Sequence, residues 1–170
     1  ASDNQGTGHE VGLGMDLNNR WAVFFNLGQG YVYRLDSSGT DRRNNLALGV
    51  SYSQRDMTKG IPLEGRLGYE RQEDRGQSLR DQQRIQLELK SQSSGDTTWF
   101  TNLNWSEGIN RATGLVDLRN NRFDLGFAYR PVLNDQLNMI VKYTWLDDQQ
   151  PLNQSGITGL EQEKAQVVAV

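Results

Sequence analysis

The sequence predicts an all-β fold, an antiparallel up-and-down transmembrane β-barrel of at least eight strands. Three observations lead to this prediction. Apolar and polar residues alternate with a period of two over most of the chain, aromatic residues gather near the ends of the alternating segments, and connecting segments alternate between short and long. Short turns are therefore expected at one end of the barrel and long loops at the other.

The composition agrees with strands that cross a bilayer. The chain of 170 residues is 35% hydrophobic, with a mean hydropathy of −0.72, and no apolar run approaches the roughly 20 residues of a membrane-spanning helix. A barrel strand escapes this test because only every second residue faces lipid. The first residues have no signal-peptide pattern, so any such peptide is expected either to have been removed or not to be part of this sequence.

Charge and cysteine content exclude several classes of function. The 18 basic and 21 acidic residues are interspersed and give a net charge of −3, unlike the one-sided basic surface of a nucleic-acid binder. Cysteine is absent, which excludes disulfides, thiolate catalysis and cysteine-based metal sites.

The alternation defines each strand in turn. In residues 20–34 the odd positions are mostly large and apolar, from Trp21 to Tyr33, whereas most even positions are small or polar. Helical spacing would mix these two sets. The expected strands are residues 11–17, 20–34, 46–52, 61–69, 85–89, 99–105, 123–129 and 137–145. Residues 164–170 are a candidate ninth strand whose two faces the sequence does not separate.

The connections have hairpin-turn chemistry where they are short, with Asn, Asp and Gly at the turns. The expected short links are residues 18–19, 58–60, 95–97 and 133–136, and the expected long ones are residues 35–43, 71–84, 107–121 and 146–163. In a meander this order places all long links at one end of the barrel.

Alternation alone leaves open whether the apolar face meets lipid or a protein core. We expect lipid, because the polar face combines glycines with charges of both signs, which suits an enclosed lumen. The residues expected to face this lumen are Asp16, Glu64, Arg66, Glu88, Lys90, Asp124, Arg130 and Lys142. The alternative is a soluble, lipocalin-like ligand-binding barrel with its apolar face inward.

Aromatic residues of the apolar face are expected to form two girdles at the membrane–water interfaces. They are Trp21, Tyr31, Tyr33, Tyr52, Tyr69, Trp99, Trp105, Tyr129, Tyr143 and Trp145. A charge near mid-membrane on this face would cost about 2–4 kcal/mol. We therefore expect Leu125→Arg to impair membrane assembly more than Asp124→Asn.

Residues 122–146, RFDLGFAYRPVLNDQLNMIVKYTWL, combine an aromatic-rich strand, a Tyr-Arg-Pro exit, an Asn-Asp turn and a strand ending in Tyr and Trp. This segment resembles barrel hairpins of Gram-negative outer-membrane proteins, and looks most like the barrel regions of large, poorly characterised proteobacterial ones. The resemblance implies a barrel in the bacterial outer membrane and transfers no catalytic residues. Such barrels usually end in an aromatic residue, which Val170 is not. Residues 1–170 are therefore expected to be one barrel domain. Either the domain is a portion of a larger barrel, which we favour, or residues 164–170 are a tail or an edge strand.

Little in the sequence suggests catalysis. A hydrolase would need the lone histidine, His9, to meet a serine such as Ser51 or Ser106, and no Gly-x-Ser-x-Gly motif occurs. We expect no enzymatic activity and no cofactor.

Acidic residues near the C-terminus are candidate ligands for a hard cation such as Ca²⁺. They are Asp147, Asp148, Glu161 and Glu163. Solvated loop acids are the simpler interpretation, and we expect no metal.

Two membrane functions remain open beside the soluble barrel. One is a pore or channel that passes small solutes or ions. The other is a structural barrel that anchors or binds other outer-membrane or periplasmic proteins through residues 71–84 and 146–163 without conducting. Membrane lipids are expected partners in both, and nucleic acid in neither.

Overall fold

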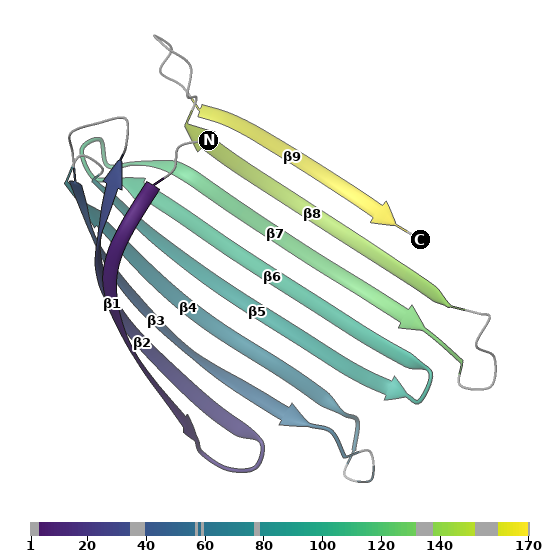
Figure 1. The fold of residues 1–170 in the computed structure, drawn as a ribbon. Helices are drawn as coiled ribbons and strands as arrows, with labels where there is room; N and C mark the ends of the chain where they lie inside the picture. The colour runs from purple at the N-terminus through teal and green to yellow at the C-terminus, as the bar shows by residue number, and fades with distance from the viewer. Residues whose placement is uncertain are drawn as a thin grey trace.

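The computed structural model describes residues 4–34, 40–56, 58, 60–76, 79–131, 138–151 and 160–169. These residues form one sheet of nine antiparallel strands in sequence order, which confirms the predicted all-β, up-and-down topology (Figure 1). The strands are β1 (Asn4–Asp16), β2 (Trp21–Arg34), β3 (Thr40–Gln54), β4 (Leu63–Arg75), β5 (Arg80–Ser94), β6 (Thr97–Asn110), β7 (Leu115–Tyr129), β8 (Met139–Pro151) and β9 (Leu160–Ala169). No helix in this part of the chain is long and apolar enough to cross a membrane.

The sheet is open. Within the described ranges β1 pairs with β2 alone and β9 with β8 alone, and the two edge strands lie well apart (Figure 1). The predicted closure into a barrel is therefore not seen in these residues. The candidate ninth strand is present and begins at Leu160, earlier than the sequence predicts.

The predicted alternation of short and long connections is wrong. Only residues 76–79 and 111–114 separate strands where long loops of 71–84 and 107–121 are predicted, while residues 55–62 take the place of the predicted short link 58–60. The predicted short link 133–136 lies outside the described residues. The strands are longer than expected because charged residues on both faces pair across strands and continue the ladder after the apolar alternation stops.

Asparagine side chains shape two of the turns. At residues 17–20 the Asn18 Oδ1 accepts hydrogen bonds from the backbone N–H groups of Arg20 and Trp21, at 2.8 and 3.0 Å. At residues 111–114 the Asn110 Oδ1 accepts from the Ala112 N–H, at 2.9 Å, and the Gly114 N–H donates to the Asn110 carbonyl oxygen, at 2.7 Å. Gly114 has a φ of 69°, which a side chain would oppose. The first turn was predicted, whereas the second lies inside a predicted long loop.

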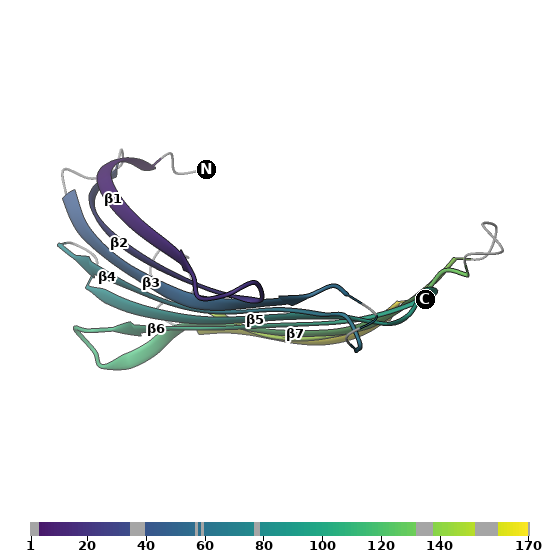
Figure 2. The ribbon, with the colours of Figure 1, turned by 90° about the horizontal axis from the view of Figure 1, so that it is seen from below.

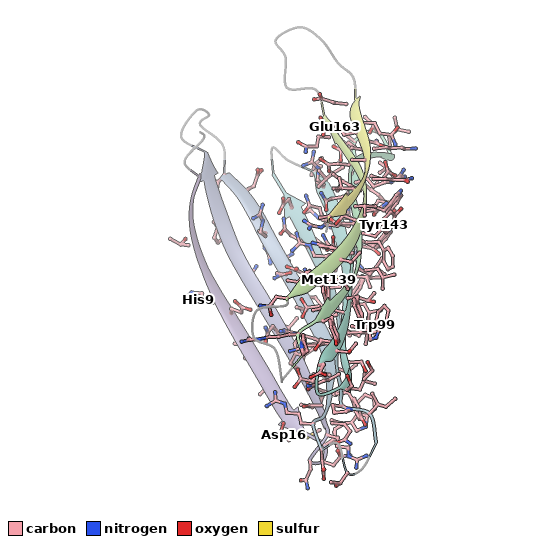
Figure 3. All side chains as sticks on the ribbon, turned by 90° about the vertical axis from the view of Figure 1, so that its right-hand side faces the viewer. His9, Asp16, Trp99, Met139, Tyr143 and Glu163 are labelled. Carbon is pink, nitrogen blue, oxygen red and sulfur yellow. The ribbon has the colours of Figure 1, made fainter. Side chains whose placement is uncertain are left out.

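The sheet curves, so that β1–β3 rise away from a flatter part that includes β5 and β7 (Figure 2). The predicted polar face is on the concave side, and on it Glu10 of β1 together with Arg84 and Glu88 of β5 line a hollow of about 290 Å³. Trp99 and Tyr143 of the predicted apolar face project from the opposite, convex side, away from β1 (Figure 3).

Candidate functional site: an apolar belt and a polar concave face

Large apolar side chains form a continuous band on the convex face, here called the apolar belt. In β1–β4 it comprises Val11, Leu13, Met15, Trp21, Val23, Phe25, Leu27, Leu46, Leu48, Val50, Tyr52, Leu63, Leu67 and Tyr69. In β5–β9 it comprises Ile85, Leu87, Leu89, Trp99, Leu103, Trp105, Phe123, Leu125, Phe127, Tyr129, Met139, Val141, Tyr143, Trp145 and Val168. These side chains align in rows across the sheet, because the register of neighbouring strands places their apolar-face positions opposite one another.

The belt is exposed, and nothing in the described part of the chain covers it. Leu13 is 69% exposed on the edge strand, and Leu48 and Leu125 remain 43% and 42% exposed within the sheet. Among the described residues no hydrophobic residue is buried. A soluble domain gains most of its folding free energy by burying such side chains, so this sheet lacks the core that a soluble domain would have.

Nine of the ten predicted girdle residues have described side chains, and all nine belong to the convex face by register. The side chain of Tyr33 lies outside the described part. Two aromatic pairs form across strands: the ring centroids of Trp21 and Tyr52 are 4.7 Å apart, as are those of Trp99 and Phe127. Tyr143 departs from a girdle position because it lies between Val141 and Trp145, inside the belt.

The upper border of the belt, the one nearer the turn at residues 111–114, crosses the strands obliquely. On β3 the belt reaches Leu46, but the residue opposite it on β4 is Arg71. On β6 it reaches Trp105, opposite Asn121 on β7, and a third step occurs between β8 and β9. Strands of barrels tilt by roughly 35–45° from the axis, so a band parallel to a membrane has to cross them in such steps.

The concave face carries seven of the eight predicted lumen residues within its strands. They are Asp16, Glu64, Arg66, Glu88, Lys90, Asp124 and Lys142. Arg130 is the exception because β7 ends at Tyr129, and its backbone N–H donates to the Asp96 carbonyl oxygen at 2.8 Å.

Two phenylalanines of the concave face lie flat over glycines of the next strand. The Phe24 ring covers Gly49, and the Arg66 guanidinium lies over the Phe24 ring, with its Cζ 4.8 Å from the ring centroid. The Phe100 ring covers Gly126, and a Cβ on either glycine would overlap the ring above it. Glycine at these two positions therefore leaves the space that the ring of the neighbouring strand fills.

Asp124 is the centre of a buried polar cluster on the concave face. It is 4% exposed and accepts hydrogen bonds from Thr144 Oγ1 at 2.6 Å and Arg122 Nε at 2.9 Å. The Lys142 Nζ lies 3.2 Å from its Oδ1. A buried carboxylate is tolerated only with such partners, so this cluster links β7 to β8 behind the belt.

Beyond the upper border of the belt both faces are mostly polar, and this part of the sheet is here called the polar extension. It comprises residues 40–45, 70–75, 80–84, 106–110, 115–122, 146–151 and 160–165. On its concave side Arg43 Nε lies 2.8 Å from Asp74 Oδ1, and Arg80 Nη2 lies 2.7 Å from Asp117 Oδ2. The hydrogen bonds that the Arg43 guanidinium donates to the Asp74 carboxylate raise the pKa of Arg43. Ion pairs therefore hold these strand ends together.

The convex side of the polar extension carries a second network. Arg75 contacts Glu73 at 2.7 Å and Asp81 at 2.8 Å, Arg111 contacts Asp81 at 2.6 Å, and Arg71 contacts Glu73 at 2.7 Å. Burial by itself would raise the pKa of Asp81, but hydrogen bonds from Arg75 and Arg111 outweigh it and lower that pKa. The carboxylate is therefore ionised at neutral pH.

Sequence reasoning missed this network because it assigned residues 71–84 and 107–121 to loops. One signal in the sequence could have identified these segments as strands: residues of opposite charge lie at similar distances before and after a turn. Glu107 and Arg119 lie on either side of the turn at residues 111–114 and are cross-strand partners, with a contact of 3.3 Å.

The arrangement of the two faces has to be interpreted from its geometry. Comparisons with protein-family models, with curated proteins and with solved structures find no match to this chain. The convex face offers apolar side chains to whatever covers it, and the concave face offers fixed charges of both signs.

The candidate catalytic residues are not brought together. His9 belongs to the convex face, opposite Gln29, whereas Ser51 and Ser106 belong to the concave face. The hydrolase arrangement considered from the sequence therefore does not form among these residues.

The candidate cation ligands are divided between the two faces. Asp147 is on the convex face and accepts a hydrogen bond from Gln162 at 2.9 Å, whereas Asp148 is on the concave face opposite Glu163. Within the described ranges no group of three or more His, Cys, Asp or Glu side chains is placed to hold a metal ion.

Proposed function

We propose that this chain is part of a pore-forming β-barrel in a bacterial outer membrane, with the apolar belt against lipid and the concave face lining the lumen. The observation that carries the proposal is the exposed belt: its side chains share one face, and no described hydrophobic residue is buried. Apolar surface of this extent requires cover. Acyl chains provide it without a second layer of protein.

The curvature of the sheet and the oblique border of the apolar belt favour this proposal over the soluble barrel. A lipocalin-like barrel needs its apolar residues on the concave side, where Glu88 and Arg84 line a hollow instead. The oblique border of the belt and the aromatic pairs near its lower edge, such as Trp21 and Tyr52, are typical of a tilted strand crossing a bilayer.

The direction of the edge strands bears on how the proposed barrel would close. In an antiparallel meander of nine strands, β1 and β9 run in the same direction. Joining them would create a parallel pair, whereas single-chain bacterial outer-membrane barrels pair antiparallel throughout and have an even number of strands. We infer that an antiparallel closed barrel would need an odd number of further strands between β1 and β9. Such a barrel is wider than the filled eight-stranded kind, which favours a conducting lumen.

Conductance in planar bilayers tests the pore. We expect the complete protein to give current well above background, with weak ion selectivity because the concave face mixes Glu88 and Asp124 with Arg66 and Lys142. Absence of current from correctly inserted protein would contradict the pore.

A structural outer-membrane barrel without conductance is the second candidate. It is favoured by the pairing of concave charges with one another, as between Asp124 and Lys142, because such pairs can fill an interior. Its expected signature is stable co-purification with an outer-membrane or periplasmic protein, together with no current.

A further inference from the structure

Four arginines gather on the convex side of the polar extension, and they are here called the arginine cluster: Arg42, Arg71, Arg75 and Arg111. The last three surround the carboxylates of Glu73 and Asp81, with contacts of 2.6–2.8 Å. Arg71 and Arg111 keep 42% and 43% of their side chains exposed. The network is thus fixed in place while its outer surface is open.

The cluster holds more positive than negative charge. Three guanidinium groups share the two carboxylates, and the fourth arginine, Arg42, lies directly opposite Arg75 in the register of β3 and β4. Like charges in this position repel each other. Among the described residues the Arg42 guanidinium contacts the Gln29 side-chain amide and no carboxylate. An external anion beside Arg42 and Arg75 would relieve this repulsion.

The concave side at the same height has the opposite balance. On the concave side of the polar extension the described arginines are Arg43, Arg80, Arg84 and Arg122, and the described carboxylates are Asp41, Glu70, Asp74, Asp117, Asp148, Glu161 and Glu163. The excess of positive charge is therefore a property of the convex face and not of the polar extension as a whole.

The cluster adjoins the upper border of the apolar belt. Arg71 lies opposite Leu46, the last belt residue of β3, and two positions beyond Tyr69, the last belt residue of β4. If acyl chains cover the belt, the headgroups of the same lipids lie at the level of Arg71 and Arg75. Guanidinium groups bind phosphate in a bidentate manner, which makes arginine well suited to this position.

We propose that the arginine cluster binds the phosphate groups of anionic membrane lipids. This inference rests on the proposed function, because it needs the belt to be in lipid. We infer a lipid because the arginine cluster lies next to the apolar belt. We infer that its phosphate group is bound because guanidinium groups bind phosphate well.

The test uses the complete protein in phosphatidylcholine nanodiscs that contain a minor fraction of phosphatidylglycerol. Native mass spectrometry measures how much phosphatidylglycerol, relative to phosphatidylcholine, stays bound when the protein is released. We expect enrichment of phosphatidylglycerol on the wild-type protein. Arg42→Gln should lower it about fivefold, equivalent to the ~1 kcal/mol of one arginine at an anionic surface.

Two further variants make the test specific. Glu73→Gln removes a negative charge from the cluster and should increase retention, which a merely destabilised protein would not do. Arg84→Gln is the matched control, because Arg84 is on the concave face and makes a single ion pair, of 3.4 Å, with Glu70. It should leave retention unchanged.

The outcomes separate this inference from the proposed function. If the protein inserts into the nanodiscs but shows no preference for phosphatidylglycerol, lipid binding by the arginine cluster is contradicted and the proposed barrel is not. Equal losses in Arg42→Gln and Arg84→Gln also overturn the cluster. Protein that does not enter nanodiscs of any composition overturns both.

Discussion

The apolar belt and the polar extension are built on the same strands but use opposite chemistry. In the belt, Leu87 and Leu103 are cross-strand partners on a face that is apolar throughout. In the polar extension of the neighbouring pair, the partners are Glu107 and Arg119. Register and hydrogen bonding continue from one region to the other. The apolar alternation therefore marks how far the apolar face extends along a strand, and not where the strand ends.

The largest effect is expected from a charge placed in the belt. Leu103 and Asn102 are neighbours on β6, with Leu103 on the convex face and Asn102 on the concave face between Glu88 and Asp124. Leu103→Arg should cost about 2–4 kcal/mol in unfolding titrations from vesicles, because a lipid-facing position has no partner for it. Asn102→Arg gains carboxylate neighbours and should be nearly neutral. Equal losses would contradict the assignment of the faces.

A smaller effect is expected behind the belt, where packing on the concave face is tight. Gly126→Val should cost about 1–3 kcal/mol, because its Cβ would overlap the Phe100 ring. The double variant Gly126→Val/Phe100→Ala should recover part of that loss in the same titration. If Phe100→Ala gives no recovery, the ring is not what requires glycine at this position.

Ion pairs of the polar extension should each contribute little. A double-mutant cycle on Glu107 and Arg119 should give a coupling energy of about 0.2–1 kcal/mol, since both side chains are partly exposed. Exchanging the two residues should restore most of the stability that either single charge reversal removes. A coupling energy as large as the cost of Leu103→Arg would remove the distinction between the two regions.

Acid should loosen the polar extension before it affects the belt. The pKa of Asp81 is lowered in the folded state, so its stabilisation is complete at neutral pH and is lost as the pH falls below about 4. The protection factors for amide hydrogen exchange at residues 80–84 should therefore fall in acid, while those of residues 85–89 stay high. Asp81→Asn should lower the protection factors of residues 80–84 already at neutral pH and should lack the acid-induced fall assigned to this carboxyl.

The sequence by itself determined the all-β class, the order of the strands and the division of residues between two faces. It could do so because a period of two fixes the face of each residue once a strand is assigned, so Trp21 and Leu125 were placed together from spacing alone. The turn at Asn18 was also predictable, because its hydrogen bonds are local.

The tertiary structure decided the length of the strands, the direction of the curvature and the partners of each charge. Residues 71–75 and 80–84 carry no apolar alternation, and only their pairing with each other and with the neighbouring strands identifies them as strand. Likewise, Phe24 and Gly49 are far apart in sequence, and their contact exists only once β2 and β3 are in register. Local patterns report which face a residue occupies, but pairing between strands depends on residues that only the folded sheet brings together.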